Sequence, residues 1–460
     1  MSEMDLADVI EDADAYELKA ATVAAIWEAV ENEDRDRLLA LLDGEHAADI
    51  ADLLEQWNQE NRLKLLTLWG EDLDGDVLSE LEEGARDQIL QDLPPELLSA
   101  AVKDLETDDV VYLIADMEDA DKAHVLDALD AADRVAVEQS LTYPEETAGR
   151  MMQRELVLAP PHWTVGDTID ALRANDDLPD EFYSVYIVDE RMRPLGSVKL
   201  GQIMARPRDA KLVDLMDEDF RTIPVDQRQE DVAYAFNQYH MVTAPVVDED
   251  GRLIGVITID DAMEVLEDEA EEDMMRLAGV GDEEISDSIW ETTRLRFPWL
   301  AVNLITAIVA SLVISMFEST LQAIVALAVL MPIVASMGGN AGTQSLTVAV
   351  RGLATRDLTG TNAWRVIRRE GIVGLLNGAA FAIIIGIIGT IWFGMPMLGV
   401  VLAVAMVINL FVAGLAGILI PIVLDKFGAD PALASGTFVT TVTDVVGFFA
   451  FLGLAGVLLL

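Results

Sequence analysis

The stretch SGTFVTTVTDVVGFFAFLGL, residues 435–454, is an apolar segment of membrane length with one carboxylate, Asp444, near its middle. At ~1.5 Å per residue, Asp444 lies roughly 16 Å from the predicted helix start, about half of a ~30 Å hydrocarbon core. A charge at that depth costs at least ~2.5 kcal/mol, so such an acid usually faces a cavity, an ion path or a partner. Thr437, Thr440 and Thr441 share its helical face. We interpret this polar stripe as a pore lining; an acid that only holds helices together is the alternative.

Five apolar segments are predicted to cross a membrane, and the charges between them orient the chain. They cover residues 298–317, 321–350, 371–393, 398–424 and 433–459. Arginines precede the first segment and cluster between the second and third, whereas the first and third connections have none. The positive-inside rule therefore places the N-terminal part in the cytoplasm and the C-terminus outside the cell membrane.

The second segment contains glycines and polar side chains at membrane depth, where lipid would accommodate them poorly. Five of its residues are predicted to line a pore: Gly338, Gly339, Asn340, Thr343 and Gln344. For the glycines alone, close packing between helices is the alternative.

The charge is distributed very unevenly along the chain. The protein has 82 acids against 30 lysines and arginines, a net charge of -52, yet residues 298–460 hold six acids and six bases. The whole excess lies in residues 1–297, where it would be self-repulsive unless concentrated salt screened it. We therefore predict a halophilic cytoplasm. A basic nucleic-acid footprint is absent, and without cysteine there are no disulfides or thiolate metal sites.

Residues 1–140 are predicted to form a helical domain. Ile50, Leu53, Leu54 and Trp57 follow the spacing of an amphipathic helix, and short helices of this kind stack as a superhelical array. Acids of this domain are interpreted as a solvated face, and a metal-binding role for any one of them is the alternative; they include Asp92, Glu96, Asp108 and Asp109.

Residues 141–211 and 212–270 repeat each other. Val188-Asp189-Glu190 recurs 59 residues later as Val247-Asp248-Glu249, and each copy alternates helices with β-branched strands. This pattern resembles a tandem pair of cystathionine-β-synthase (CBS) domains. Such pairs often bind adenine nucleotides, and the segment with Thr258 and Asp261 is similar to their ribose and phosphate motif. The resemblance implies ATP as a candidate ligand, at one site only, because the first copy lacks the matching Asp.

An acidic run, DDAMEVLEDEAEED at residues 260–273, lies on a predicted helix. Clustered carboxylates repel one another unless cations intervene, so the run is either a solvated halophilic face or a sensor of Mg2+ or Ca2+. A connecting helix over residues 271–297 is expected to lead without a proline break into the first membrane segment.

Three long motifs identify a family resemblance: LTYPEETAGRMM at residues 141–152, PIVASMGGNAGTQSLTVAVRGLATRDL at 332–358 and TTVTDVVGFFAFLGLA at 440–455. Together with the CBS pair they resemble the MgtE family of magnesium channels. The resemblance implies a homodimer whose second and fifth membrane helices surround one pore, with Asp444 holding hydrated Mg2+. It also implies closure of the pore by cytoplasmic Mg2+ bound between the CBS and N-terminal domains.

The positions that match the family's acidic sensor set are Glu230, Asp261, Glu264, Glu269, Glu272, Asp273 and Asp430. His240 stands where another acid is expected. The sequence thus predicts a multidomain α and α/β protein with a polytopic membrane domain at residues 298–460. It is expected to be no enzyme but a Mg2+-selective channel or transporter. The alternatives are a broader carrier or exporter of Mg2+, Co2+ or Mn2+, and a membrane-anchored nucleotide sensor.

Overall fold

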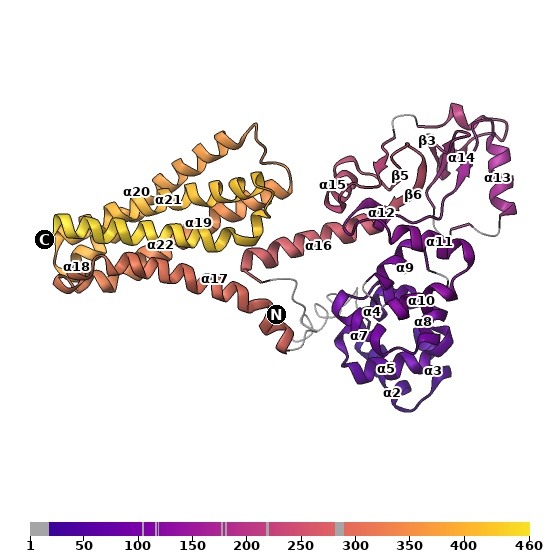
Figure 1. The fold of residues 1–460 in the computed structure, drawn as a ribbon, viewed down its shortest axis with the longest axis horizontal. Coiled ribbons are helices and arrows are strands. Elements are labelled where there is room, and N and C mark those ends of the chain that lie inside the picture. The colour runs from indigo at the N-terminus through magenta and orange to yellow at the C-terminus, as the bar shows by residue number, and fades with distance from the viewer. Residues whose placement is uncertain are drawn as a thin grey trace, which may run out of the picture. The chain divides into compact units, whose positions relative to one another are not determined.

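The computed structural model describes residues 18–103, 105–115, 117, 119–175, 178–179, 182–217, 220–280 and 289–460 (Figure 1). The chain forms two compact units, Met1–Glu267 and Asp268–Leu460.

The first part of the first unit is helical, as predicted. Its helices are α2 (Ala20–Glu31), α3 (Arg35–Leu42), α4 (Ala47–Gln56), α5 (Gln59–Trp69), the 3-10 helix η1 (Gly70–Asp72), α6 (Asp76–Ser79), α7 (Glu83–Asp92), α8 (Pro95–Ala101), α9 (Thr107–Ile114), α10 (Asp119–Ala128), α11 (Ala131–Ser140) and α12 (Ala148–Met151). One apolar core joins α2 to α11, and the periodic residues Ile50, Leu53 and Leu54 of α4 are buried in it. The short α12 packs instead in the core of the second sheet described below. Asp34 and Asn58 cap the N-termini of α3 and α5, because their side chains accept hydrogen bonds from backbone amides in the first turn of each helix.

The second part of this unit contains two similar three-stranded sheets. The first is built from β1 (Leu158–Ala159), β2 (Ser184–Val188) and β3 (Pro194–Lys199), and the second from β4 (Ile223–Pro224), β5 (Thr243–Val247) and β6 (Leu253–Thr258). In each, the first pairing is parallel and the second antiparallel. Their helical elements are α13 (Val165–Ala174), α14 (Leu200–Ala205), η2 (Leu212–Asp214), α15 (Gln229–Tyr239) and α16 (Ile259–Ala278). The short strands β1 and β4 are additions that the sequence pattern did not predict.

The predicted repeat is confirmed in its details. The register shifts after Ile187 in one sheet and after Val246 in the other, at equivalent positions. The conserved spacing of the acidic turns has a local cause: the Asp189 carboxylate accepts the amides of Arg191 and Arg193, and Asp248 does the same for Asp250 and Arg252.

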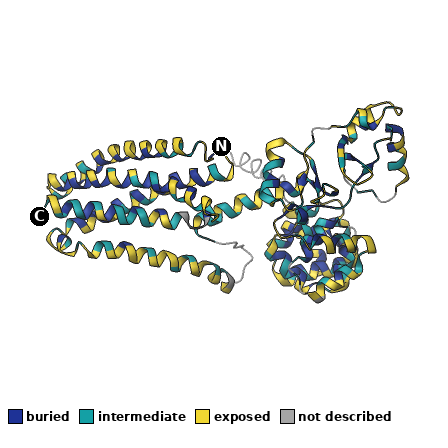
Figure 2. Ribbon diagram, turned by 45° about the horizontal axis from the view of Figure 1, so that its top comes forward, coloured by how far each residue is buried: buried dark blue, intermediate teal, exposed yellow. Residues whose placement is uncertain are grey.

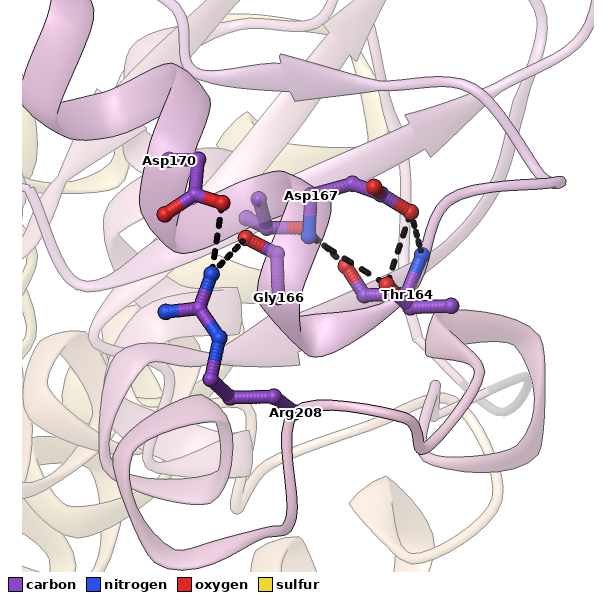
Figure 3. A network of polar contacts seen from close by, with 6 residues as sticks. Thr164, Gly166, Asp167, Asp170 and Arg208 are labelled. Atoms are coloured by element: carbon purple, nitrogen blue, oxygen red, sulfur yellow. Dashed lines mark hydrogen bonds and ion pairs between the residues drawn. The ribbon is translucent and has the colours of Figure 1, made fainter.

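The start of α13 shows how the first copy fixes its helix (Figure 3). The Thr164 hydroxyl accepts the amide of Asp167, whose carboxylate accepts the amide and hydroxyl of Thr164, forming a capping box. These hydrogen bonds hold the pKa of the exposed Asp167 below its usual value. Arg208 then ties the following loop to this helix by bonding the Gly166 carbonyl and Asp170.

The second unit contains five helices long and apolar enough to cross a membrane, among the described residues. These are α17 (Ile289–Ser315), α19 (Ala326–Ala354), α20 (Ala363–Phe393), α21 (Pro396–Lys426) and α22 (Pro431–Leu458), with the short α18 (Glu318–Ala323) between the first two. The predicted segments are confirmed in number and order. The helix α20 begins at Ala363, earlier than predicted, since the polar stretch RVIRRE continues it outside the apolar segment. The helix α22 begins at Pro431, slightly earlier than predicted.

Burial is distributed unequally among the membrane helices (Figure 2). The apolar window of α21 is 56% buried, whereas that of α17 is 6% buried. The helix α21 packs against α19, α20 and α22, and α17 packs against α22. An isolated chain therefore leaves α17 for lipid or another protein to cover.

The expected unbroken helix into the membrane is not observed. The helix α16 ends at Ala278, and Gly279 follows with a φ of +75°, a left-handed conformation that stops a helix at little cost for glycine. The next described helix begins at Ile289, and residues 281–288, which belong to the predicted connecting helix, lie outside the described residues.

Candidate ion path and acidic sites

Asp444 is half-buried near the middle of α22. It follows Pro431, the first residue of the helix, by thirteen positions, roughly 20 Å at ~1.5 Å per residue. Asp430 precedes the helix and its carboxylate accepts the amide of Ala432 at 2.7 Å, which explains the earlier start. A carboxylate therefore stands close to the midplane of the apolar bundle.

The three predicted threonines use their hydroxyls within the protein. Thr440 and Thr441 donate to the carbonyls one turn earlier, those of Gly436 and Thr437, at 2.9 and 2.6 Å. Thr437 donates to the side-chain oxygen of Asn303 on α17 at 2.8 Å. Sequence reasoning missed Asn303, although an amide alone in an apolar segment is a detectable signal.

A polar stripe runs along the exposed side of α19. The predicted residues Asn340, Thr343 and Gln344 are exposed, and Ser336 and Thr347 extend the stripe at spacings of one helical turn. Asn340 lies 3.4 Å from the Ser336 hydroxyl. Exposed amides and hydroxyls in a membrane-length helix are unfavourable against lipid, so this side requires water or protein.

The two predicted pore glycines differ in their surroundings. Gly338 is buried, and a Cβ built there would lie 2.3 Å from the side-chain nitrogen of Asn409 on α21. Gly339 has open space around it, with nothing within 4 Å of such a Cβ. Close packing thus accounts for Gly338, as the alternative interpretation of the glycines held, whereas Gly339 remains available to a pore.

Acids of the first unit gather beside α9. Burial raises the pKa values of Glu106, Asp108 and Asp109, and the charge of Asp261 at the start of α16 raises all three further. Burial raises the pKa of Glu106 to about 8 and that of Asp109 to about 7, with further contributions from Glu155 and Asp261 respectively. Burial likewise raises the pKa of Asp108 well above its usual value.

The interpretation of Asp108 and Asp109 as a solvated face was therefore wrong. Both are partly buried, and each is close enough to Asp261 for repulsion to contribute to its raised pKa. The contact arises because α9 packs against α12 and Thr107 donates to Glu155 at 2.6 Å. Nothing in the sequence distinguishes these acids from the exposed ones, since the difference depends on long-range packing.

The residues predicted for sensing or nucleotide binding in the first unit have separate environments. Thr258 and Asp261 are brought together, as the Asp261 carboxylate accepts the hydroxyl of Thr258 at 2.6 Å and its amide at 3.2 Å. Burial raises the pKa of Asp261 to about 6 despite these bonds. Glu230 forms an ion pair with Arg228, and Glu264 is exposed. His240, at a φ of 53°, is the exposed C-cap of α15.

Four charged residues of the second unit meet where α16 approaches α22. Arg276 forms ion pairs with Glu272 on its own helix and with Asp430 at the start of α22, the latter at 2.6 Å. Burial, and next the charge of Asp430, raise the pKa of Asp273 to about 6. Leu277 packs into a small core with Leu346 of α19 and Val439 of α22. Glu269, also predicted as a sensor, is partly buried one turn earlier.

Across the described parts of the chain, no three His, Cys, Asp or Glu side chains form a group that could already hold a metal ion. Of the predicted sensor acids, Asp261 lies close to the acids of α9, and Glu272 and Asp273 lie close to Asp430. Glu230 and Glu264 belong to neither group, since Glu230 pairs with Arg228 and Glu264 is exposed. A cation held through its own water shell would need less convergence of these carboxylates than direct ligation.

Comparison with known proteins agrees with this architecture. Residues 331–454 match the family model of divalent cation transporters, residues 45–146 the MgtE intracellular N domain and residues 212–268 the CBS domain. The chain is 36% identical over 319 residues to the magnesium transporter MgtE of Enterococcus faecalis, covering 69% of this chain and 70% of the relative. It is 35% identical to that of Thermus thermophilus, covering 70% and 72% respectively.

A solved structure of the cytosolic domain of the Mg2+ channel MgtE in complex with ATP is 29% identical. It covers 53% of this chain and 99% of that one, with a TM-score of 0.49. The matched family models together cover parts of the helical N domain, the second CBS copy and the membrane helices. The chain is a multi-pass membrane protein with cytosolic N-terminal domains, and it belongs to the MgtE family of magnesium transporters.

Proposed function

We propose that this protein conducts Mg2+ along a path lined by α19 and α22, with Asp444 as the ion-binding carboxylate. The observation that carries this proposal is the half-buried acid at mid-membrane, on a helix that packs against the polar-striped α19. Mg2+ sheds its waters reluctantly, so amide and hydroxyl groups suit it because they can bind the water shell rather than the ion. Asn340, Thr343, Gln344 and Thr440 provide such groups on exposed positions.

The path is proposed to lie between two copies of the chain. A single chain leaves the polar stripe of α19 and most of α17 uncovered. The two surfaces require different environments, because lipid suits the apolar α17 and water suits the polar stripe of α19. A homodimer with its two-fold axis along α19 and α22 would enclose the stripes and place two Asp444 carboxylates around one divalent ion, leaving little net charge.

Cytoplasmic Mg2+ is proposed to close this path. In the first unit, burial and repulsion by Asp261 disfavour the ionised forms of Asp108 and Asp109. A divalent cation relieves that repulsion and would draw α9 and the start of α16 together. In the second unit, Glu272, Asp273 and Asp430 offer a similar gain at the other end of α16. The remaining predicted sensors, Glu230, Glu264 and Glu269, would support these sites as outer carboxylates.

ATP is proposed as a second ligand of the CBS repeat at Thr258 and Asp261. Their mutual hydrogen bonds place an acid and a hydroxyl at the start of α16, next to the end of β6. An acid at that place can bind ribose hydroxyls, and it cannot serve a cation and a nucleotide in the same way at once. Binding of ATP and of Mg2+ at Asp261 should therefore affect each other. The C-terminus is proposed to lie outside the cell membrane, as the arginine distribution predicts.

The decisive experiment is Mg2+ uptake into proteoliposomes at molar KCl, comparing the native protein with Asp444→Asn. We expect Asp444→Asn to lose most Mg2+ flux or its preference for Mg2+, because the ring of two acids would be neutral. Equal conduction by both proteins would reject Asp444 as the ion-binding residue and direct the search to Asn340 and Gln344. Competition by Co2+ and Mn2+ in the same assay distinguishes a Mg2+-selective channel from a broader divalent carrier.

A further inference from the structure

Asn409 is a polar residue buried at the centre of the membrane domain. It lies near the middle of α21, the most deeply buried of the five long helices, and its exposed fraction is 0%. Its neighbours on the helix, Met406 and Leu410, belong to an apolar core that also contains Val334 and Phe448. An amide in such surroundings is costly, so its presence requires an explanation.

The hydrogen bonds of Asn409 are incomplete. Its side-chain nitrogen donates to the Val334 carbonyl of α19 at 2.8 Å, and its side-chain oxygen is buried with no partner in the structure. An unsatisfied buried acceptor costs at least as much stability as a hydrogen bond such as that to Val334 typically returns. Leucine has a similar size and would avoid the cost, so stability alone does not explain the asparagine.

The amide is also wedged between two helices. A Cβ built on Gly338 of α19 would lie 2.3 Å from the Asn409 nitrogen, and one built on Gly447 of α22 would lie 2.9 Å from the same atom. Both distances are too short for a real side chain, so glycine is required on either side of the amide. One side chain of α21 thus determines how closely both α19 and α22 can approach.

The two glycines lie next to the residues of the proposed ion path. Gly338 precedes Asn340 by two positions, and Gly447 follows Asp444 by three, less than one helical turn. A shift of either helix at its glycine would therefore move the polar stripe or the carboxylate. Since Asn409 bonds α19 and contacts α22, its placement couples the two.

We propose that Asn409 is a positioning residue that sets the spacing of α19 and α22 and thereby places Asp444 for selective Mg2+ passage. The inference rests on the proposed role of these helices as the pore lining. Asn409 does not contact the ion in this scheme. It acts through Gly338 and Gly447, and the cost of its unpaired oxygen is tolerated because an apolar side chain cannot fix the position of α19 by a hydrogen bond.

The test compares Asn409→Leu with a matched control, Asn377→Leu, at an exposed position of α20. Full-length variants in proteoliposomes would be assayed for the ratio of Mg2+ to K+ flux, and in detergent for their melting temperature. Asn409→Leu is expected to lower the flux ratio at least fivefold while melting no earlier than the native protein. Asn377→Leu is expected to change neither. Asn409→Asp, whose neutral acid form keeps the shape and one donor, is expected to restore most of the ratio.

Two outcomes would overturn the proposal: a native flux ratio in Asn409→Leu, or a loss in Asn409→Leu that Asn409→Asp shares in full. If Asn409→Leu does not fold, Gly447→Ala carries the test, because its methyl group presses on the amide and must lower the ratio too; a native ratio there refutes the proposal. Asp444→Asn, assayed in parallel, distinguishes failure of the pore assignment from failure of the role proposed for Asn409. A native ratio in Asp444→Asn rejects the pore assignment itself, whereas a lost ratio there with a native one in Asn409→Leu rejects only the role of Asn409.

Discussion

Arg276 occupies the place where the proposed inner Mg2+ site would hold its cation. Its guanidinium pairs with Glu272 and Asp430, and the pKa of the nearby Asp273 is raised by burial and then by the charge of Asp430. Mg2+ that binds these three acids must therefore displace the guanidinium or share their carboxylates with it. We predict that Arg276→Gln lowers the internal Mg2+ concentration that half-inhibits flux.

The size of the shift follows from the burial of the pair. The Arg276 and Asp430 side chains are 28% and 25% exposed, between a surface pair worth ~0.2–1 kcal/mol and a buried charged hydrogen bond worth ~1.5–3 kcal/mol. Removing a competing ion pair worth ~1–2 kcal/mol should lower the internal Mg2+ concentration that half-inhibits flux about 5-fold to 30-fold. Without Mg2+, the same variant has unopposed acids between α16 and α22, so its flux should equal or exceed the native flux.

The assay is Mg2+ flux into proteoliposomes with internal Mg2+ varied at one fixed molar KCl concentration, because salt screens such pairs. Arg351→Gln is the control, as it removes the same charge from an exposed position at the end of α19. An unchanged half-inhibiting concentration in Arg276→Gln would refute competition. A higher concentration would mean that Arg276 helps to build the site instead.

Three further predictions concern the acids. Replacing Glu269, Glu272 and Asp273 together by amides should raise flux at high internal Mg2+; unchanged inhibition would remove them from the sensor. Because Asp109 and Glu106 have raised pKa values of about 7 and 8, the folded first unit binds protons that the unfolded chain releases. The free energy of unfolding of this unit should therefore fall as the pH rises through these pKa values of about 7 and 8, and Mg2+ should restore it. Hydrogen exchange of the α9 amides in the full-length protein, corrected for intrinsic rates, measures this, and Asp109→Asn should reduce the dependence. The acidic surface predicts an earlier melting temperature at low KCl than at molar KCl; no difference would contradict the halophilic interpretation.

Local patterns were sufficient to predict most of the fold. The spacing of Ile50, Leu53 and Leu54 indicated the helices of the first unit, and the repeat of Val188-Asp189-Glu190 indicated two similar sheets whose hairpins turn on Asp189 and Asp248. Apolar length was enough for the membrane helices. The break after Ala278 was missed because a single glycine is tolerated inside many helices, and only its positive φ reveals a stop.

The sites were predictable only where polarity conflicts with its surroundings. Asp444 and Asn340 stand out because the segments around them are apolar. Asn409 carries the same signal and was overlooked, since one amide in a long apolar helix also fits helix packing. In the acidic first unit there is no such contrast, so Asp108 and Asp109 could not be separated from acids such as Asp92 before the packing of α9 was known.

Exposed and buried acids of the first unit therefore differ in how strongly salt screens their charges. On the halophilic prediction, exposed acids of the first unit would keep the protein soluble in concentrated salt, where screening weakens the repulsion among them. Screening does not reach the acids beside α9 to the same extent, since burial is the largest cause of the raised pKa values of Glu106, Asp108 and Asp109. Monovalent salt relieves the first group and leaves the second under repulsion. A divalent ion that enters among buried carboxylates can consequently be sensed even where potassium is abundant, and this difference in burial is what would allow a Mg2+ sensor to work within a halophilic surface.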